Sequence, residues 1–328
     1  MMRPTLSSSL YGLSRRNLLK AGGAAVLTTP FVSRAWAATT EINMLAWYGH
    51  GEPDMVAEYE AANNVKFVPK YYAGGDNMLA LIAQSPPGTY DLILSDGEFV
   101  QQLNLAGYID EMEPGDYPLD DMLHEDFKQF PGHWADGKMY SMMLRGGHLG
   151  VSYNKNSVKA EEATSYECFW KPELEGKVGH FDWHLPTLGM MSLYNGNGAS
   201  LWDLDDAKWD AVQETTMGLR KQVGGFFDYG GTFNGLKNGD MQAMVGIGDW
   251  ITGVLEKDGA PVASVIPKEG GIQFTESYSI GKGSEKAAQV KNFIQYMMSP
   301  AGQVKSAQMA AYPGFCVTKA GRAALIEA

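Results

Sequence analysis

The sequence has little cysteine and no long hydrophobic run. Only Cys168 and Cys316 occur in 328 residues, so no disulfide framework holds the fold together. A single bridge between them stays open, because the sequence does not show how closely their Cα atoms approach. No apolar run approaches the roughly 18 residues that a membrane helix needs. We therefore expect a soluble chain that is stabilised by its core.

Positive charge is also scarce. Lysine and arginine number 26 against 38 aspartates and glutamates, which gives a formal charge of −12. The first 37 residues hold five basic residues and no acidic one, so the remaining 291 residues carry −17 (−12 − 5). Such an excess of carboxylates repels phosphate backbones and favours cations. Nucleic acid is therefore not an expected partner.

The basic residues near the N-terminus form a pattern of their own. The stretch "SRRNLLK" at 14–20 precedes a weakly apolar run, Ala21 to Thr28, and "SRAWA" ends in a small-x-small pattern at Ala35 and Ala37. The segment resembles a twin-arginine export signal that ends at a signal-peptidase site. A basic amphipathic helix is the alternative. Residues 1–37 are therefore predicted to be a removable signal, with the mature chain in a periplasm.

The first part of the mature chain alternates strands with helices. Predicted strands are "EINMLAWYG", "VKFVPKYY" and "YDLILSD"; predicted helices are "EPDMVAEYEAANN", "NMLALIAQ" and "EFVQQLNLAG". This alternation predicts a mainly parallel sheet covered on both faces, with ligand chemistry at the carboxyl ends of its strands. Residues 111–143 look loop-like, with three prolines and the turn "ADGK".

The second part predicts another lobe. The stretch 148–155 precedes a segment of low periodicity, 187–223 is helix-rich, "NGDMQAMVGIGDW" ends in a buried strand and a turn, and "VASVIPKEGGIQFTESYSIG" predicts further strands. Two C-terminal amphipathic helices are expected to separate at Ser299-Pro300. There is no internal repeat and no low-complexity linker, so we expect the chain to cross between two lobes more than once.

Four ordered motifs carry a resemblance to a known family. "SYECFWKPELEGKV", "IPKEGGIQFTESYSIGKG", "YDLILSDGEFV" and "LGVSYNK" resemble segments of the periplasmic spermidine/putrescine-binding proteins of ABC importers. The likeness runs from about Glu41 to Lys319.

The resemblance implies an α/β, type II periplasmic-binding-protein fold whose two lobes enclose a ligand cleft. Lobe 1 would comprise 38–148 plus about 277–328, lobe 2 would comprise 149–276, and the crossings would lie near 147–152 and 265–277. The receptor would bind a small cation such as a polyamine and dock, as a monomer, on a membrane permease with its ATPase. No catalysis, cofactor or metal is implied.

A polyamine site needs carboxylates for the ammonium groups and aromatic faces for the methylene stem. Ten residues fall on or near the family's ligand positions: Trp47, His50, Asp96, Glu98, Asp182, Trp183, Asp249, Phe274, Glu276 and Tyr278. Glu98 has an equally good reading as the N-terminal carboxylate of a helix. Glu276 lies in a strand of buried character, where a carboxylate needs a ligand or a buried partner. Tyr278 and Tyr312 are weaker candidates.

One segment departs from the family pattern. Where the family supplies two acids, this chain reads "FDWHLPT", which keeps Asp182 but places Trp183 and Pro186 at the acidic positions. A ligand with fewer primary ammonium groups, or a bulkier and methylated one, would suit this change.

Other classes are weaker alternatives. His180, Asp182 and His184 would share one face of a strand and could ligate a metal. The Tyr pair of "KYYAGG" is of the kind found in ferric-ion receptors. An exported hydrolase would need a nucleophile with a base, and no such signature stands out. A sugar receptor of the same fold is the most serious rival.

Overall fold

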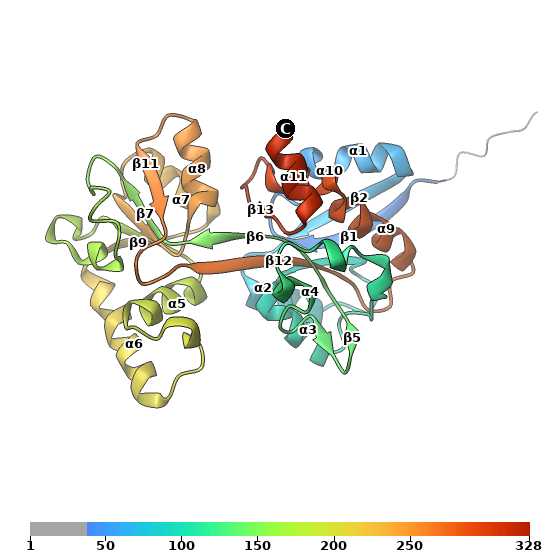
Figure 1. The fold of residues 1–328 in the computed structure, drawn as a ribbon, viewed down its shortest axis with the longest axis horizontal. Helices are drawn as coiled ribbons and strands as arrows, with labels where there is room; N and C mark the ends of the chain where they lie inside the picture. The colour runs from blue at the N-terminus through green and yellow to red at the C-terminus, as the bar shows by residue number, and fades with distance from the viewer. Residues whose placement is uncertain (1–37) are drawn as a thin grey trace, which may run out of the picture. The chain divides into compact units, whose positions relative to one another are not determined.

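The computed structural model describes residues 38–328, of which Thr39–Ala328 form one compact unit. Its strands form two main sheets, each accompanied by its own helices (Figure 1). We refer to them as the six-stranded lobe and the five-stranded lobe. The predicted signal and its cleavage site lie outside the described residues.

The six-stranded sheet has the order β13-β6-β12-β3-β1-β2. Its members are β1 (Thr40–Ala46), β2 (Val65–Tyr71), β3 (Leu92–Asp96), β6 (Met142–Leu149), β12 (Ile272–Ile280) and β13 (Phe315–Cys316). β1 runs parallel to β2 and β3, whereas β12, β6 and β13 are joined by antiparallel pairing. The prediction of a mainly parallel sheet is wrong for this half. β12 returns from the other lobe directly as a strand, without the helical crossover that would make it parallel.

The five-stranded sheet has the order β11-β7-β10-β8-β9. Its members are β7 (Val151–Asn154), β8 (Val178–Phe181), β9 (Val223–Phe227), β10 (Ala243–Val245) and β11 (Val262–Val265). β8 is parallel to β9 and β10, and β7 is antiparallel to β10 and β11. Segment 111–143 is mostly loop, as predicted. It also holds a small hairpin of β4 (Trp134–Ala135) and β5 (Lys138–Met139), turned by Asp136 and Gly137 at positive φ.

The helices divide between the two lobes. The six-stranded lobe carries α1 (Pro53–Asn63), α2 (Gly75–Ala83), α3 (Val100–Leu105), α4 (Glu125–Lys128), α9 (Ala287–Met298), α10 (Pro300–Ala307) and α11 (Lys319–Glu327). The five-stranded lobe carries α5 (His184–Tyr194), α6 (Asp206–Gly218), α7 (Tyr229–Lys237) and α8 (Asp249–Lys257). Short 3-10 helices occupy Gly97–Phe99, Pro114–Asp116, Leu119–Asp121, Tyr166–Trp170, Pro172–Leu174, Gly198–Ser200 and Leu219–Lys221.

Two helix boundaries follow the sequence closely. α1 ends at Asn63, and Asn64 adopts the left-handed conformation with φ 51°, as a helix that closes on asparagine requires. α9 and α10 separate at Ser299, whose hydroxyl accepts from the amide of Gly302, while Pro300 opens the next helix. Both boundaries were predicted.

Side chains of β1 are buried on both faces of the six-stranded sheet. Ile42 and Met44 pack in one hydrophobic cluster, whereas Leu45 packs with Ile93 in a second. Because helices cover both faces, only the strand ends are free to meet a ligand. The expectation of a sheet covered on both faces is confirmed.

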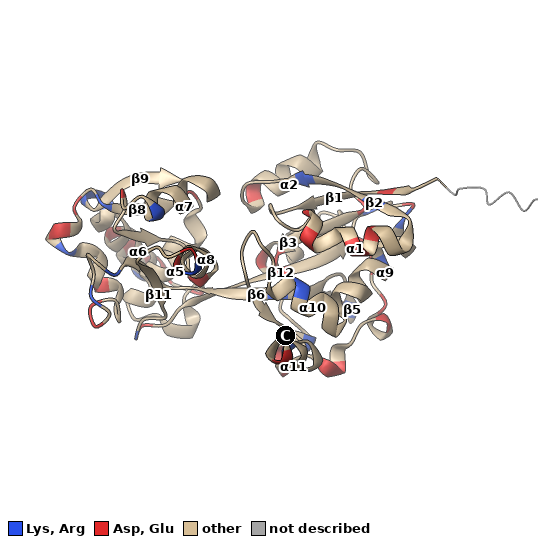
Figure 2. Cartoon of the chain, turned by 90° about the horizontal axis from the view of Figure 1, so that it is seen from above, with Lys and Arg blue, Asp and Glu red and all other residues tan. Residues whose placement is uncertain are grey.

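Two paired strands connect the lobes. β6 leads through Gly150 into β7, and β12 brings the chain back, antiparallel to β6 from Ile272 opposite Leu149 to Tyr278 opposite Met142. Figures 1 and 2 show β6 and β12 side by side between the two groups of elements. The lobe boundaries at 148 and about 277 stay a prediction. Within residues 38–328, no helix combines the length and apolarity that a membrane span needs.

We predict that Gly248→Ala is destabilising. A Cβ on Gly248 would lie 1.8 Å from the carbonyl oxygen of His148 in the connecting strand, and backbone cannot move aside cheaply. The free energy of unfolding, measured in denaturant, should fall by about 1–3 kcal/mol. Gly253→Ala is the matched control, because this exposed position in α8 has open space around it. There, alanine should stabilise by about 0.5–1 kcal/mol. Equal effects at both positions would contradict the clash.

Candidate ligand-binding site

A cavity of about 320 Å³ lies among residues of both lobes. The residues that line it are Trp47, Tyr48, Tyr72, Ala73, Gly74, Asp96, Leu149, Phe181, Asp182, Trp183, Asp228, Tyr229, Gly246, Trp250, Phe274, Glu276 and Tyr312. Most stand at or just after the carboxyl ends of the parallel strands β1, β2, β3, β8, β9 and β10. This is where α/β sheets present ligand-binding side chains.

Aromatic side chains dominate the cavity wall. Nine of the lining residues are Trp, Tyr or Phe. Several pairs bring together rings from the two lobes: the Trp47 and Trp183 centroids are 6.0 Å apart, those of Tyr48 and Tyr229 5.8 Å, and those of Trp250 and Tyr312 5.6 Å. Such faces attract cations and pack against alkyl chains.

Among the residues that the structure describes, the acidic or basic side chains in the wall are all carboxyl groups. Asp96, Asp182, Asp228 and Glu276 line the cavity, and none of its lining residues in the described part of the chain is lysine or arginine. Asp96 and Glu276 are buried, whereas Asp182 and Asp228 are exposed. The wall is therefore electrostatically suited to a positively charged ligand.

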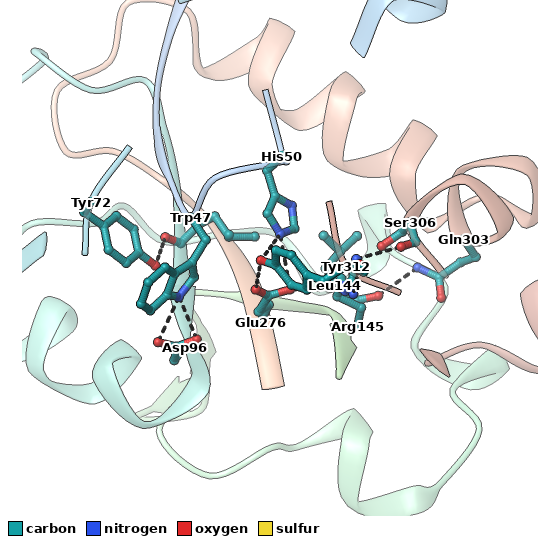
Figure 3. A network of polar contacts seen from close by, with 11 residues as sticks. Trp47, His50, Tyr72, Asp96, Leu144, Arg145, Glu276, Gln303, Ser306 and Tyr312 are labelled. Atoms are coloured by element: carbon teal, nitrogen blue, oxygen red, sulfur yellow. Dashed lines mark hydrogen bonds and ion pairs between the residues drawn. The ribbon is translucent and has the colours of Figure 1, made fainter. Parts of the chain in front are cut away.

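Asp96 is a buried carboxyl group at the end of β3. The indole Nε1 of Trp47 donates to its two oxygens, at 3.0 and 3.1 Å (Figure 3). Burial raises the pKa of Asp96 well above its usual value, the charges of Glu98 and Glu276 raise it further, and the bond from Trp47 lowers it in part. A cation beside Asp96 would reverse this trend, because it favours the ionised form.

Glu276 lies directly opposite Asp96 in the β3–β12 pairing, but its environment differs. The Nε atom of Arg145 lies 3.1 Å from its Oε2, His50 Nε2 lies 3.2 Å from the same oxygen, and the Tyr312 hydroxyl donates to Oε1 at 2.5 Å. Burial opposes ionisation, but the neighbouring His50 and Arg145 and the hydrogen bonds outweigh it and lower the pKa of Glu276. Glu276 is thus an ionised carboxylate with its partner inside the protein.

Arg145 is itself held in place from three sides. It is fully buried, donates through Nη1 to the carbonyl of Ser306 at 2.7 Å and through Nη2 to that of Tyr312 at 2.9 Å, and lies over the Tyr312 ring at 4.8 Å (Figure 3). Gln303 ties the same region to β6 by donating to the carbonyl of Leu144 at 2.9 Å. The network connects the cavity wall with α10 and the segment after it.

Comparison with known proteins assigns this architecture to a family. Residues 54–323 match the family model described as bacterial extracellular solute-binding protein. The chain belongs to this family. A relative named spermidine/putrescine-binding periplasmic protein 1, from Haemophilus influenzae, is 24% identical over 281 residues, which cover 84% of this chain and 76% of that protein. The family resemblance expected from the four sequence motifs is confirmed.

Solved structures confirm the fold of this solute-binding protein. The spermidine/putrescine ABC transporter substrate-binding protein PotD from Streptococcus pneumoniae superimposes with a TM-score of 0.68 at 16% identity, covering 84% of this chain and 83% of that one. The PBP MotA from A. tumefaciens B6, in complex with glucopine, gives a TM-score of 0.72 at 14% identity, covering 88% and 87%. The predicted two-lobe, type II fold is therefore correct.

Six of the ten predicted site residues line the cavity of this solute-binding protein. They are Trp47, Asp96, Asp182, Trp183, Phe274 and Glu276. The sequence left open whether Glu276 pairs with a ligand or with a buried partner, and the structure supplies Arg145 as a buried partner.

The other four predicted residues do not line the cavity. His50 is buried next to Glu276, and Tyr278 is a core residue of β12 beyond a register shift after Glu276. Glu98 is exposed in the first turn of the 3-10 helix after β3, which fits its helix-terminus reading. Asp249 is exposed at the start of α8, and its neighbour Trp250 lines the cavity instead.

Several lining residues were not predicted from the sequence. They are Tyr48, Tyr72, Phe181, Asp228, Tyr229 and Trp250, while Tyr312 was only a weak candidate. Asp228 and Tyr229 follow β9, which begins at Val223, where the predicted helix-rich region ends, and which the sequence analysis did not assign. Recognising "VGGFF" as a strand would have placed "DY" at its carboxyl end.

The metal alternative required His180, Asp182 and His184 to lie on one strand, but the strand ends before the last two. β8 stops at Phe181 and His184 begins α5, so the three proposed ligands do not share a strand face. Among residues 38–328, no group of three or more His, Cys, Asp or Glu side chains is placed to hold a metal ion. Cys168 and Cys316 are both buried and free.

We predict that Glu276→Gln is strongly destabilising. The substitution leaves the guanidinium of Arg145 buried without its counter-charge, which typically costs about 3–5 kcal/mol. The double variant Arg145→Gln/Glu276→Gln removes both charges and should recover part of that loss. Denaturant unfolding measures both, and a single variant as stable as wild type would contradict the ion pair.

We predict that Asp96→Asn stabilises the ligand-free protein at neutral pH. Folding raises the pKa of Asp96, so the folded protein holds this proton more tightly than the unfolded chain does. The resulting contribution to stability is fully present below the ordinary aspartate pKa, about 3.9, and is lost as pH rises from there through the pKa of the folded state. The asparagine variant lacks this loss, so its advantage in unfolding free energy should grow with pH.

Asp91→Asn is the matched control for this prediction. Asp91 is buried with Lys286 Nζ at 3.0 Å and accepts from the Ser284 hydroxyl at 2.7 Å, so its substitution should destabilise by about 1–3 kcal/mol. Denaturant unfolding across pH measures both variants. An Asp96→Asn protein that is less stable than wild type at neutral pH would contradict the raised pKa of Asp96.

Proposed function

We propose that this solute-binding protein is the periplasmic receptor of an ABC importer for small polyamine-like organic cations. The observation that carries the proposal is the cavity wall, which combines nine aromatic residues with four carboxylates and, among the described residues, no basic side chain. Alkylammonium ions match this wall, because carboxylates attract the charged groups and aromatic rings cover the alkyl stem.

The comparisons support the ligand class and the partners. A relative that covers 84% of this chain is named for binding spermidine and putrescine in the periplasm. A receptor of this kind passes its ligand to a membrane permease with a cytoplasmic ATPase, so these are the partners that we propose. The protein acts by binding and release and performs no catalysis.

Capture would use closure of the two lobes around the ligand. β6 and β12 are paired along the connection between the lobes, and bending there would open the cavity. Two contacts cross the cavity: the Tyr229 hydroxyl of α7 donates to the carbonyl of Ala311, and the Trp47 ring lies against that of Trp183. A ligand that touches both sides stabilises the closed state in proportion to its preference for it.

Within the cavity, we assign the charge contact to Asp96 and the main stacking contacts to Trp47, Trp183 and Phe274. Asp96 is buried and its protein contacts are hydrogen bonds from one indole, so a cation can complete its environment. Asp182 and Asp228 would assist from the exposed side of the cavity. Glu276 would shape the wall rather than hold an ammonium group directly.

We predict that Asp96→Asn weakens amine binding while it leaves the fold intact. The loss of one buried charge contact should lower the affinity for the best-binding amine by at least about tenfold, or 1.4 kcal/mol. Isothermal titration of the purified protein with amines of different length measures this directly.

Asp249→Asn is the control, because Asp249 is exposed and does not line the cavity; its affinity should equal that of wild type. A neutral sugar that binds wild type and Asp96→Asn equally well, with no amine binding, would favour the sugar-receptor alternative and overturn the proposal.

A further inference from the structure

The two buried carboxylates of the cavity wall do not offer equal charge to a ligand. Asp96 and Glu276 are directly opposite each other on β3 and β12, an arrangement in which two free negative charges repel. The protein provides a counter-charge for only one of these two carboxylates. Glu276 is matched by the guanidinium of Arg145 at 3.1 Å, whereas the hydrogen bonds to Asp96 come from the neutral indole of Trp47.

Arg145 cannot easily leave Glu276 when a ligand enters. Both side chains are buried, and the two terminal nitrogens of Arg145 are bound to the carbonyls of Ser306 and Tyr312. Gly314 packs so closely that a Cβ there would lie 2.5 Å from Nη2 of Arg145. The fixed positive charge of Arg145 therefore cancels the charge of Glu276 for any ligand in the cavity.

The remaining two carboxylates add little binding energy. Asp182 and Asp228 are exposed, and Oδ1 of Asp228 already accepts from the amide of Gly231 at the start of α7, at 2.7 Å. Ion pairs at exposed positions contribute little, because water screens the attraction. A second ammonium group near Asp182 and Asp228 would lose its hydration and gain only a weak attraction in exchange.

We infer that the cavity selects ligands with a single cationic head, seated against Asp96, and an uncharged remainder. This inference rests on the proposed function and narrows it from polyamine-like cations to singly charged ones. Such ligands include a mono-acylated diamine, an amino alcohol or a quaternary ammonium compound.

The surroundings of Asp96 fit one cationic head. The ring of Trp47 lies 4.8 Å from that of Tyr72 and 6.0 Å from that of Trp183, centroid to centroid, so two further aromatic rings surround the indole that donates to Asp96. The Tyr72 hydroxyl donates to the carbonyl of Leu94, and Glu98, whose charge acts on Asp96, does not line the cavity. Asp96 is therefore the lining carboxyl group of this aromatic corner. Aromatic surface and a single negative charge favour one cation with an apolar or neutral stem.

The test compares three probes of similar shape that differ in charge. Isothermal titration of the wild-type protein would use 1,4-diaminobutane (two charges), its mono-N-acetyl derivative (one charge) and its N,N′-diacetyl derivative (no charge). We expect the mono-acetyl compound to bind at least tenfold more tightly than the diamine, and the diacetyl compound to bind weakest.

The outcomes separate this inference from the proposed function. Tighter binding of the diamine than of the mono-acetyl compound overturns the single-charge inference but supports an amine receptor. Equal binding of the diacetyl and mono-acetyl compounds overturns both, because charge would then not matter. No binding of any probe at millimolar concentration also counts against both.

A pair of variants tests the role of Arg145. Arg145→Gln frees the charge of Glu276 and should shift the preference toward the diamine, whereas Arg145→Gln/Glu276→Gln should keep the wild-type preference. An unchanged preference in a folded Arg145→Gln protein would overturn the argument from charge cancellation. Should either variant fail to fold, the three-probe comparison on wild type still decides.

Discussion

The ion pair between Arg145 and Glu276 is the contact on which the rest of the site depends. It joins β6 to β12, the two strands that connect the lobes, and through Arg145 it reaches the carbonyls of Ser306 and Tyr312 in the C-terminal part of the chain. Burying two charges costs desolvation energy, and their attraction offsets that cost only when their geometry is good. β6, β12 and the C-terminal segment must therefore keep their relative positions. The cavity wall, the connection between the lobes and the C-terminal helices are therefore positioned by one interaction (Figure 3).

The same interaction explains why two neighbouring carboxyl groups behave differently. Folding lowers the pKa of Glu276 and raises that of Asp96, although the two residues face each other on paired strands. Opposite shifts of this kind separate roles within one site. Glu276 keeps a constant charge that holds the framework, whereas ionisation of Asp96 is costly until a cation arrives. Burial of Asp96 lowers the stability of the protein when no cation is bound. In return, a bound cation contacts a carboxyl group that is already desolvated.

The sequence predicted the fold well where the signals are local. Strand and helix alternation, the helix caps at Asn64 and Ser299, and the family motifs predict the elements and their order. What the sequence missed depends on long-range pairing. The antiparallel position of β12 requires knowledge of where the chain returns from the second lobe. Arg145 lies about 130 residues from Glu276, and no spacing rule connects them. Trp250 was missed in favour of Asp249 because one residue of rotation decides which side chain of a helix start faces the cavity. Asp228 and Tyr229 were missed because glycines at 224 and 225 obscure the short edge strand that precedes them.

The arrangement of Trp47 and Trp183 has an optical consequence. These indoles belong to different lobes, yet their ring centroids are 6.0 Å apart, close enough for their excited states to interact directly. Any separation of the lobes breaks this pair and changes the emission and the near-ultraviolet dichroism of both rings. The molecule thus contains its own chromophore pair, and lobe movement in solution can be followed without attaching a dye.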